Sequence, residues 1–183
     1  MKELNQYIIE RLKLNKNDKA IIKPNYKPKT SKQLRKLLKK LLKERGPNAD
    51  LNDIDVSNID DMSPEIISKG AGMSIIGLFD ELDPHNIDIS KWDVSNVENM
   101  DRMFANCENF DCDLSLWNVK KVKDMQYMFA NCESFAGVGL DDWKVSEDCY
   151  TEGTFLNCDL VRKNPPSFYR YSGAIWTDED MGW

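Results

Sequence analysis

A repeating unit of 25 or 26 residues is the feature that most constrains how this chain can fold. Residues 88–110 read DISKWDVSNVENMDRMFANCENF, and 25 residues later Trp, Val, Met, Phe, Asn and Cys return at the same offsets. A weaker copy follows after a further 26 residues, and a partial copy precedes the first, with 13 extra residues between Met62 and Leu78. Units of this length cannot bury an apolar face alone, so neighbouring units must stack. The sequence therefore predicts three and a half stacked units.

Each unit contains apolar residues at helical spacing. Val97, Met100, Phe104 and Cys107 fall at i, i+3, i+7 and i+10, which predicts a short helix that begins near Asn96. Asparagine tolerates the left-handed conformation that ends a helix. Such a residue returns where each predicted helix must end, at Asn106, Asn131 and Asn157.

Each unit also contains a short segment with one apolar residue between two polar ones. Asp-Ile-Ser at 88–90 and Asp-Leu-Ser at 113–115 predict short strands with one buried face. Stacked in register, they would form a narrow parallel sheet with a strand spacing of about 4.8 Å. The outward side chains, which we predict to form a partner-binding face, are Asp88, Ser90, Asp113, Ser115 and Asp141. A cation site or a catalytic pair of carboxylates is the alternative, but catalysis needs carboxylates in different environments, and a regular row supplies similar ones.

These repeats resemble a known family. The frame DISKWDVSNV at 88–97, with Met100, Met103 and Phe104, resembles the BspA-type leucine-rich-repeat family, also called the DUF285 or lipoprotein-associated repeat. The resemblance implies a solenoid that binds partners without catalysis, because members are mostly surface or adhesion-like proteins. The fold class that we predict is an α/β repeat solenoid, in which short parallel strands and short helices stack in leucine-rich-repeat-like coils behind an N-terminal capping helix.

Charge divides the chain into a basic beginning and an acidic remainder. Residues 1–50 carry a net charge of +10, and the rest carries −16. We predict four segments: a short helix and linker at 1–29, a basic amphipathic helix at 30–50, the repeat solenoid at 51–160, and a C-terminal cap with an acidic tail at 161–183. An exposed docking tail centred on Trp176 and Trp183 is the alternative for the last segment.

The basic helix is predicted to begin at Thr30 or Ser31 and to end near Arg45, before Gly46 and Pro47. Its apolar face would cover the open end of the stack, because a solenoid needs an end that is apolar inside and polar outside. Membrane-surface binding or a free partner helix remains the alternative. The predicted apolar face contains Leu34, Leu37, Leu38, Leu41 and Leu42.

The first residues form a second, shorter apolar stripe. It consists of Leu4, Tyr7, Ile8 and Leu12, and we predict it to be a docking segment. The surrounding residues 4–16 resemble a leader found on otherwise dissimilar proteins of crAss-like phages, which implies delivery into a virion. A simple helix packed on the body is the alternative.

Residues for metal or cofactor chemistry are scarce. The chain has five cysteines without a CxxC pair and the single histidine His85, so we expect neither a zinc site nor a bound cofactor. Cys107, Cys132 and Cys158 share one repeat offset, which favours a buried ladder over a disulfide or a soft-metal site. Cys112 and Cys149 fall outside that ladder, and we expect them to be more exposed.

We therefore expect a protein-binding chain that is not an enzyme. Its predicted partner is a host or phage protein, and its predicted location is the bacterial host cytoplasm or a phage virion. No apolar stretch is long enough for a membrane span, and the N-terminus lacks the pattern of a signal peptide. The alternatives are a virion-associated structural protein docked through its N-terminal segment and, more distantly, a nucleic-acid-associated protein that uses its basic N-terminus.

Overall fold

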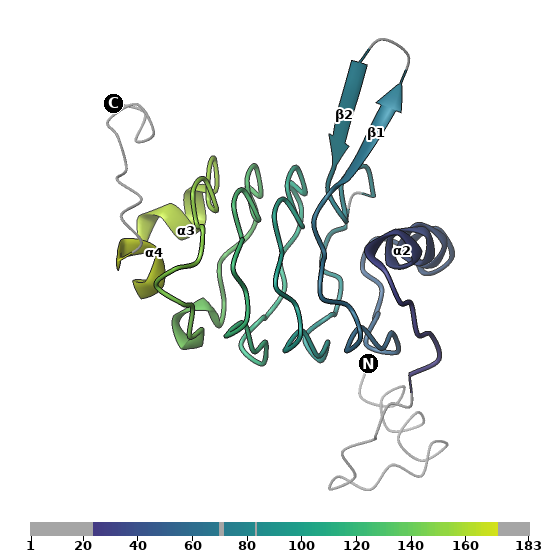
Figure 1. Ribbon diagram of the computed structural model, residues 1–183, viewed down its shortest axis with the longest axis horizontal. Coiled ribbons are helices and arrows are strands. Elements are labelled where there is room, and N and C mark those ends of the chain that lie inside the picture. The colour runs from purple at the N-terminus through teal and green to yellow at the C-terminus, as the bar shows by residue number, and fades with distance from the viewer. Residues whose placement is uncertain (1–23, 70–71, 83, 172–183) are drawn as a thin grey trace, which may run out of the picture.

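The computed structural model describes residues 24–69, 72–82 and 84–171. The loops of successive repeats lie side by side between α2 at one end and α3 and α4 at the other, and the hairpin of β1 and β2 projects away from them (Figure 1). The elements are α2 (Ser31–Arg45), β1 (Glu65–Lys69), β2 (Gly72–Ile76), the 3-10 helix η1 (Leu140–Asp142), α3 (Asp159–Lys163) and α4 (Ser167–Tyr171).

The predicted α/β solenoid of parallel strands and helices is wrong. Among the described residues the only strands are β1 and β2, an antiparallel pair in which Glu65 lies opposite Ile76. They belong to the insertion and not to the repeat. The α-helices lie before residue 46 or after residue 158, so the helix predicted near Asn96 is absent, and so are the strands predicted at 88–90 and 113–115. The repeats consist of turns that isolated parallel bridges connect, such as Asn99 to Asp124.

The repeats do not form the predicted helices because successive backbone amides donate to different loops. The Met103 amide donates within its own turn to the Met100 carbonyl (3.2 Å), but the next amide, that of Phe104, donates to Met128 in the following repeat (2.9 Å). An α-helix would require both amides to bond four residues back. Arg102 also has a φ of 49°, which interrupts any right-handed helix. The helical spacing therefore predicted which residues are buried but not the backbone that buries them.

The prediction for the asparagines is confirmed in its backbone geometry. Asn106, Asn131 and Asn157 have φ values of 65°, 61° and 54°. They close turns of the loops and not helices. Their amides also form a chain, in which Asn131 Nδ2 donates to Asn106 Oδ1 (2.7 Å) and Asn157 Nδ2 donates to Asn131 Oδ1 (2.8 Å).

The core consists of ladders of equivalent side chains from successive loops. The rings of Phe79, Phe104, Phe129 and Phe155 stack with centroid separations of 5.0, 5.4 and 5.7 Å. Each repeat tryptophan donates its indole N–H to a carbonyl of the preceding loop, as Trp117 does to Ile89 (3.1 Å). The predicted cysteine ladder is confirmed as buried and free of disulfides, at Cys107, Cys132 and Cys158. Burial of these rows holds adjacent loops in register.

Both ends of the stack are covered. Helix α2 occupies the range predicted for it, and the Thr30 hydroxyl caps it by accepting a hydrogen bond from the Gln33 amide (3.3 Å). Its buried leucines, which join the same core as the repeats, are Leu34, Leu38, Leu41 and Leu42. At the other end Phe168 stacks on Trp143 (6.1 Å), and Tyr169 meets Phe155 edge to face (5.0 Å).

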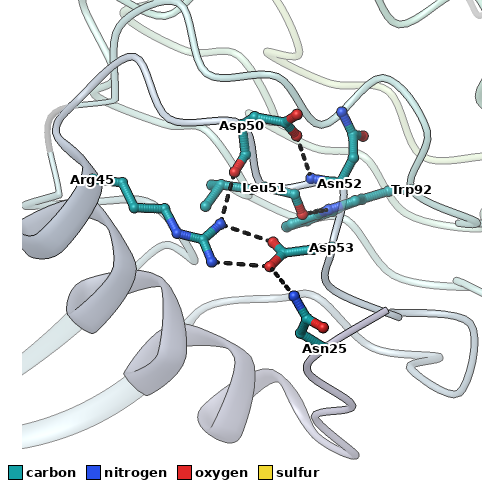
Figure 2. A network of polar contacts seen from close by, with 7 residues as sticks. All are labelled: Asn25, Arg45, Asp50, Leu51, Asn52, Asp53 and Trp92. Carbon is teal, nitrogen blue, oxygen red and sulfur yellow. Dashed lines mark hydrogen bonds and ion pairs between the residues drawn. The ribbon is translucent and has the colours of Figure 1, made fainter. Parts of the chain in front are cut away.

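Arginines join α2 to the segments beside it. Figure 2 shows Arg45 at the end of α2 in a two-pronged contact with Asp53 of the first loop, at 2.8 and 2.9 Å. Arg45 also donates to the Asp50 carbonyl (2.9 Å), and Asn25 donates to the second oxygen of Asp53 (3.1 Å). Arg35 donates to main-chain carbonyls at the base of the hairpin, including that of Leu78 (2.8 Å). These contacts fix the helix on the stack.

Replacement of Leu38 by alanine is expected to lower the free energy of unfolding by about 2 to 5 kcal/mol, because Leu38 is fully buried. Urea denaturation of the full chain measures this. The matched control is Leu160→Ala, since Leu160 is 45% exposed. Equal unfolding midpoints for Leu38→Ala and the wild type would show that α2 contributes nothing to the core.

Replacement of Asp53 by asparagine is expected to lower stability at neutral pH by about 1.5 to 3 kcal/mol, the range for hydrogen bonds to charged groups. The hydrogen bonds from Arg45 hold the pKa of Asp53 below its ordinary value. Since the folded pKa is lowered, this stabilisation is present above the unfolded pKa of about 3.9 and is lost as the pH falls through the folded pKa. Unfolding curves of both proteins between neutral pH and pH 2 should converge in acid. A constant difference would contradict the assignment.

Candidate functional site

Four of the five residues predicted to form the partner-binding face surround one hollow. Its volume is about 450 Å³. The lining residues are Ile87, Asp88, Ser90, Cys112, Asp113, Ser115 and Leu116. The fifth predicted residue, Asp141, is not among them. Two adjacent loops therefore contribute one acidic residue and one serine each, together with apolar side chains.

The aspartates of the hollow have a structural role that the sequence interpretation missed. Asp88 Oδ1 accepts hydrogen bonds from the Ser90 amide (3.1 Å) and hydroxyl (2.7 Å), and Asp113 Oδ1 accepts one from the Ser115 amide (2.9 Å). The same turn occurs at Asp93 and at other repeat positions. Aspartate followed two residues later by serine favours this side-chain turn, and that signal was available in the sequence. The pattern of one apolar residue between two polar ones, at 88–90 and 113–115, therefore indicates a turn and not a strand.

Both carboxylates are ionised at neutral pH. Burial acts to raise the pKa of Asp88, but hydrogen bonds from Ser90 and Asn52 and the charge of Lys91 together more than offset it, so the pKa lies below its ordinary value. The amide and hydroxyl of Ser115 lower the pKa of Asp113. Asp88 and Asp113 are exposed to solvent. The hollow therefore presents two negative charges from neighbouring loops.

The hollow also has apolar lining residues beside its carboxylates. Leu116 is 72% exposed, the highest value among the exposed large apolar side chains of the described residues. The equivalent positions one repeat earlier and later hold Lys91 and Asp142, so an apolar residue at a charged offset was the signal that could have identified it. The hollow therefore combines an exposed leucine with two carboxylates.

Cys112 contributes a thiol to the hollow, and the surroundings of this thiol lower its reactivity. Burial raises the pKa of the Cys112 thiol to about 11, and the charges of Asp88 and Asp113 act in the same direction. The thiolate is the nucleophilic form of cysteine, so this thiol is a poor nucleophile at neutral pH. The expectation that Cys112 and Cys149 are exposed is wrong for Cys149, which is buried, whereas Cys112 is partly buried.

The acidic row ends at Asp113 because the next equivalent residue is Gly139. Gly139 has a φ of 86°, and a Cβ there would lie 2.3 Å from the Ser115 nitrogen. The glycine thus lets the following loop approach Ser115 closely. Asp141 follows it in η1 and occupies the offset of Ser115, not that of Asp113. Because of this offset, Asp141 does not extend the row formed by Asp88 and Asp113.

The remaining predicted features lie elsewhere. The docking segment of Leu4, Tyr7, Ile8 and Leu12 lies outside the described residues. Among the residues that the structure describes, no group of three or more His, Cys, Asp or Glu side chains could hold a metal ion. No helix in that part of the chain is long and apolar enough to cross a membrane.

Cys112 is expected to react with iodoacetamide about 100-fold more slowly in the native protein than in the urea-unfolded protein at pH 8, because its raised pKa leaves little thiolate. Mass spectrometry of the alkylated peptide measures the rate at this residue. Rates that agree within a few-fold in the two states would show an accessible, ordinary thiol and would contradict the described environment.

Comparison with known proteins gives a family without a known activity. No curated protein and no solved structure matches the chain. One family model, described as "Mycoplasma protein of unknown function, DUF285", matches residues 32–168. The match covers α2, all of the repeats and the start of the C-terminal cap. It includes every residue that lines the hollow, and the chain belongs to the DUF285 family.

Proposed function

We propose that this protein is a non-catalytic binding protein and that the hollow is its site for a protein partner. The observation that carries the proposal is the position of the exposed Leu116 beside the ionised carboxylates of Asp88 and Asp113. Such a site fits a partner segment that presents an apolar side chain next to a lysine or an arginine. The resemblance of the repeats to the BspA-type family supports a binding role, because members of that family are mostly surface or adhesion-like proteins.

The chemistry of the hollow favours binding over catalysis. Acid–base catalysis by two carboxylates requires pKa values that differ, but the pKa values of Asp88 and Asp113 are both lowered. Nucleophilic catalysis by Cys112 requires a lowered thiol pKa, and here the pKa is about 11. The thiol is thus held in its poorly nucleophilic protonated form, and neither carboxyl group is held protonated as a general acid.

A virion-associated structural protein is the second candidate. It is supported by the resemblance of residues 4–16 to leaders of crAss-like phage proteins, and the location that we propose is a phage virion or the cytoplasm of the bacterial host. A nucleic-acid-associated role is a third and weaker candidate. The net charge of −16 on residues 51–183 would repel phosphate, so only the basic N-terminal part suits it.

The partner can be captured with a photo-crosslinking amino acid in the hollow. We expect a crosslinker at Leu116 to capture a protein from the natural host that the same group at Lys120, exposed in the same repeat, does not capture. Capture at both positions would show that contact is not confined to the hollow.

Binding of the purified partner then tests whether the carboxylates of Asp88 and Asp113 contribute to the site. The double variant Asp88→Asn/Asp113→Asn is expected to weaken binding about 2- to 30-fold, because exposed charge pairs contribute about 0.2 to 1 kcal/mol each. Asparagine still accepts the turn hydrogen bond, so the fold is retained. Asp93→Asn is the control, since Asp93 forms the same turn outside the hollow. An equal loss in the control, or none in the double variant, would place the binding site elsewhere.

A further inference from the structure

Helix α2 presents an outward face made of lysines. An α-helix turns by about 100° per residue, so five exposed lysines of α2 fall within a sector of roughly 100°. The buried leucines occupy the opposite side. We call this set the lysine face: Lys32, Lys36, Lys39, Lys40 and Lys43.

Within the described part of the chain, carboxylates pair with only two lysines of this face. Lys32 contacts Glu65 (2.8 Å), and Lys40 lies 4.0 Å from Glu44. Lys36, Lys39 and Lys43 form no ion pair with another described residue. The acidic repeats therefore do not neutralise the centre of the lysine face.

One flank of the stack has the opposite charge. Residues 84–90, 104–119 and 129–143, which we call the acidic flank, contain no lysine or arginine. Hydrogen bonds hold these segments together: the Asp111 amide donates to the His85 carbonyl (3.3 Å), and the Ser134 amide donates to the Glu108 carbonyl (3.0 Å). The acids of this flank are Asp88, Glu108, Asp111, Asp113, Glu133, Asp141 and Asp142.

We propose that the lysine face of one copy docks on the acidic flank of a second copy, at Glu108 and Glu133. Both glutamates are exposed, and they lie 25 residues apart at the same offset of neighbouring loops. Hydrogen-bonded neighbours of this kind are spaced by about 4.8 Å. Along α2, Lys36 and Lys39 are separated by about 4.5 Å of helix rise, so cations and anions repeat at similar distances.

Other anionic partners fit less well. Insertion of α2 into a lipid surface would require its apolar face, which is buried in the core. A nucleic acid would approach a chain whose remaining residues carry −16, whereas that same charge attracts the lysine face of another copy. The contact joins two different surfaces, so it is head-to-flank and can extend to further copies. The acidic flank includes the residues that line the hollow, but the contact is placed at Glu108 and Glu133, which do not line it, so variants at these two glutamates test the contact separately from the proposed function.

Such an interface is weak and depends on salt. Exposed ion pairs contribute about 0.2 to 1 kcal/mol each, and the screening length falls from about 30 Å at 0.01 M salt to about 3 Å at 1 M. Sedimentation velocity of the full chain should therefore show species heavier than the 21.2 kDa monomer at low salt and the monomer alone at high salt.

Charge-neutralising variants test the two surfaces. Lys36→Gln/Lys39→Gln/Lys43→Gln and Glu108→Gln/Glu133→Gln should each weaken low-salt association, the first by about 3- to 160-fold. The control Lys91→Gln/Lys120→Gln/Lys144→Gln removes the same charge from exposed lysines of the repeats and should not weaken it. A mixture of the two test variants should stop at a 1:1 dimer, because only one intact lysine face and one intact acidic flank remain.

Several results would overturn the proposal. A monomer at every salt concentration excludes self-association, and association that all three variants retain places the interface elsewhere. Saturable binding of duplex DNA that the Lys36, Lys39 and Lys43 variant loses, in a chain that stays monomeric, would assign the lysine face to nucleic acid.

Discussion

Hydrogen bonds between the backbones of successive loops are the interaction on which the rest of this structure depends. Amides of a loop alternate between partners in their own turn and carbonyls one repeat away, as those of Met103 and Phe104 do. This alternation brings equivalent side chains into contact, and the phenylalanine, tryptophan and cysteine ladders follow from it. At the left-handed residue Asn131 the amide donates to the Leu156 carbonyl one repeat away (2.8 Å), and the next amide, that of Cys132, donates back to Phe129 (3.1 Å). Sequence periodicity thus becomes a periodic core.

The same arrangement determines where binding specificity can lie. Inward positions repeat because each must match its neighbour, whereas outward positions are free to differ between loops. Asp88 and Asp113 carry out both tasks, since one oxygen closes a turn while the charge faces solvent. Leu116, by contrast, occupies an offset that holds Lys91 in the preceding loop. The proposed binding surface therefore consists of aspartate turns that recur in successive loops, together with an apolar residue, Leu116, that one loop alone has at its offset.

Much of the packing could be predicted from the sequence, but the backbone could not. The repeat identified the buried residues, and the leucine pattern with its cap identified α2, because burial depends on side-chain spacing alone. Spacing of i, i+3 and i+7 also suits a chain of tight turns, so Val97 to Cys107 was interpreted as a helix. Four residues of the candidate site were found by their shared offset. Asp141 is exposed as predicted but does not line the hollow, because the 26-residue unit places Gly139 at the offset of Asp113.

The distribution of arginine and lysine in α2 connects the fold to its surfaces. Arginine has a planar fork that can bond two acceptors at once, whereas lysine is a strongly hydrated point charge. Accordingly, Arg35 donates to main-chain carbonyls at the base of the hairpin and Arg45 donates to Asp53, so the two arginines join the helix to the hairpin and to the first loop. The lysines, which would give less geometric precision there, lie on the outer side. One helix thereby separates the cations that hold the molecule together from the cations that remain available to a partner.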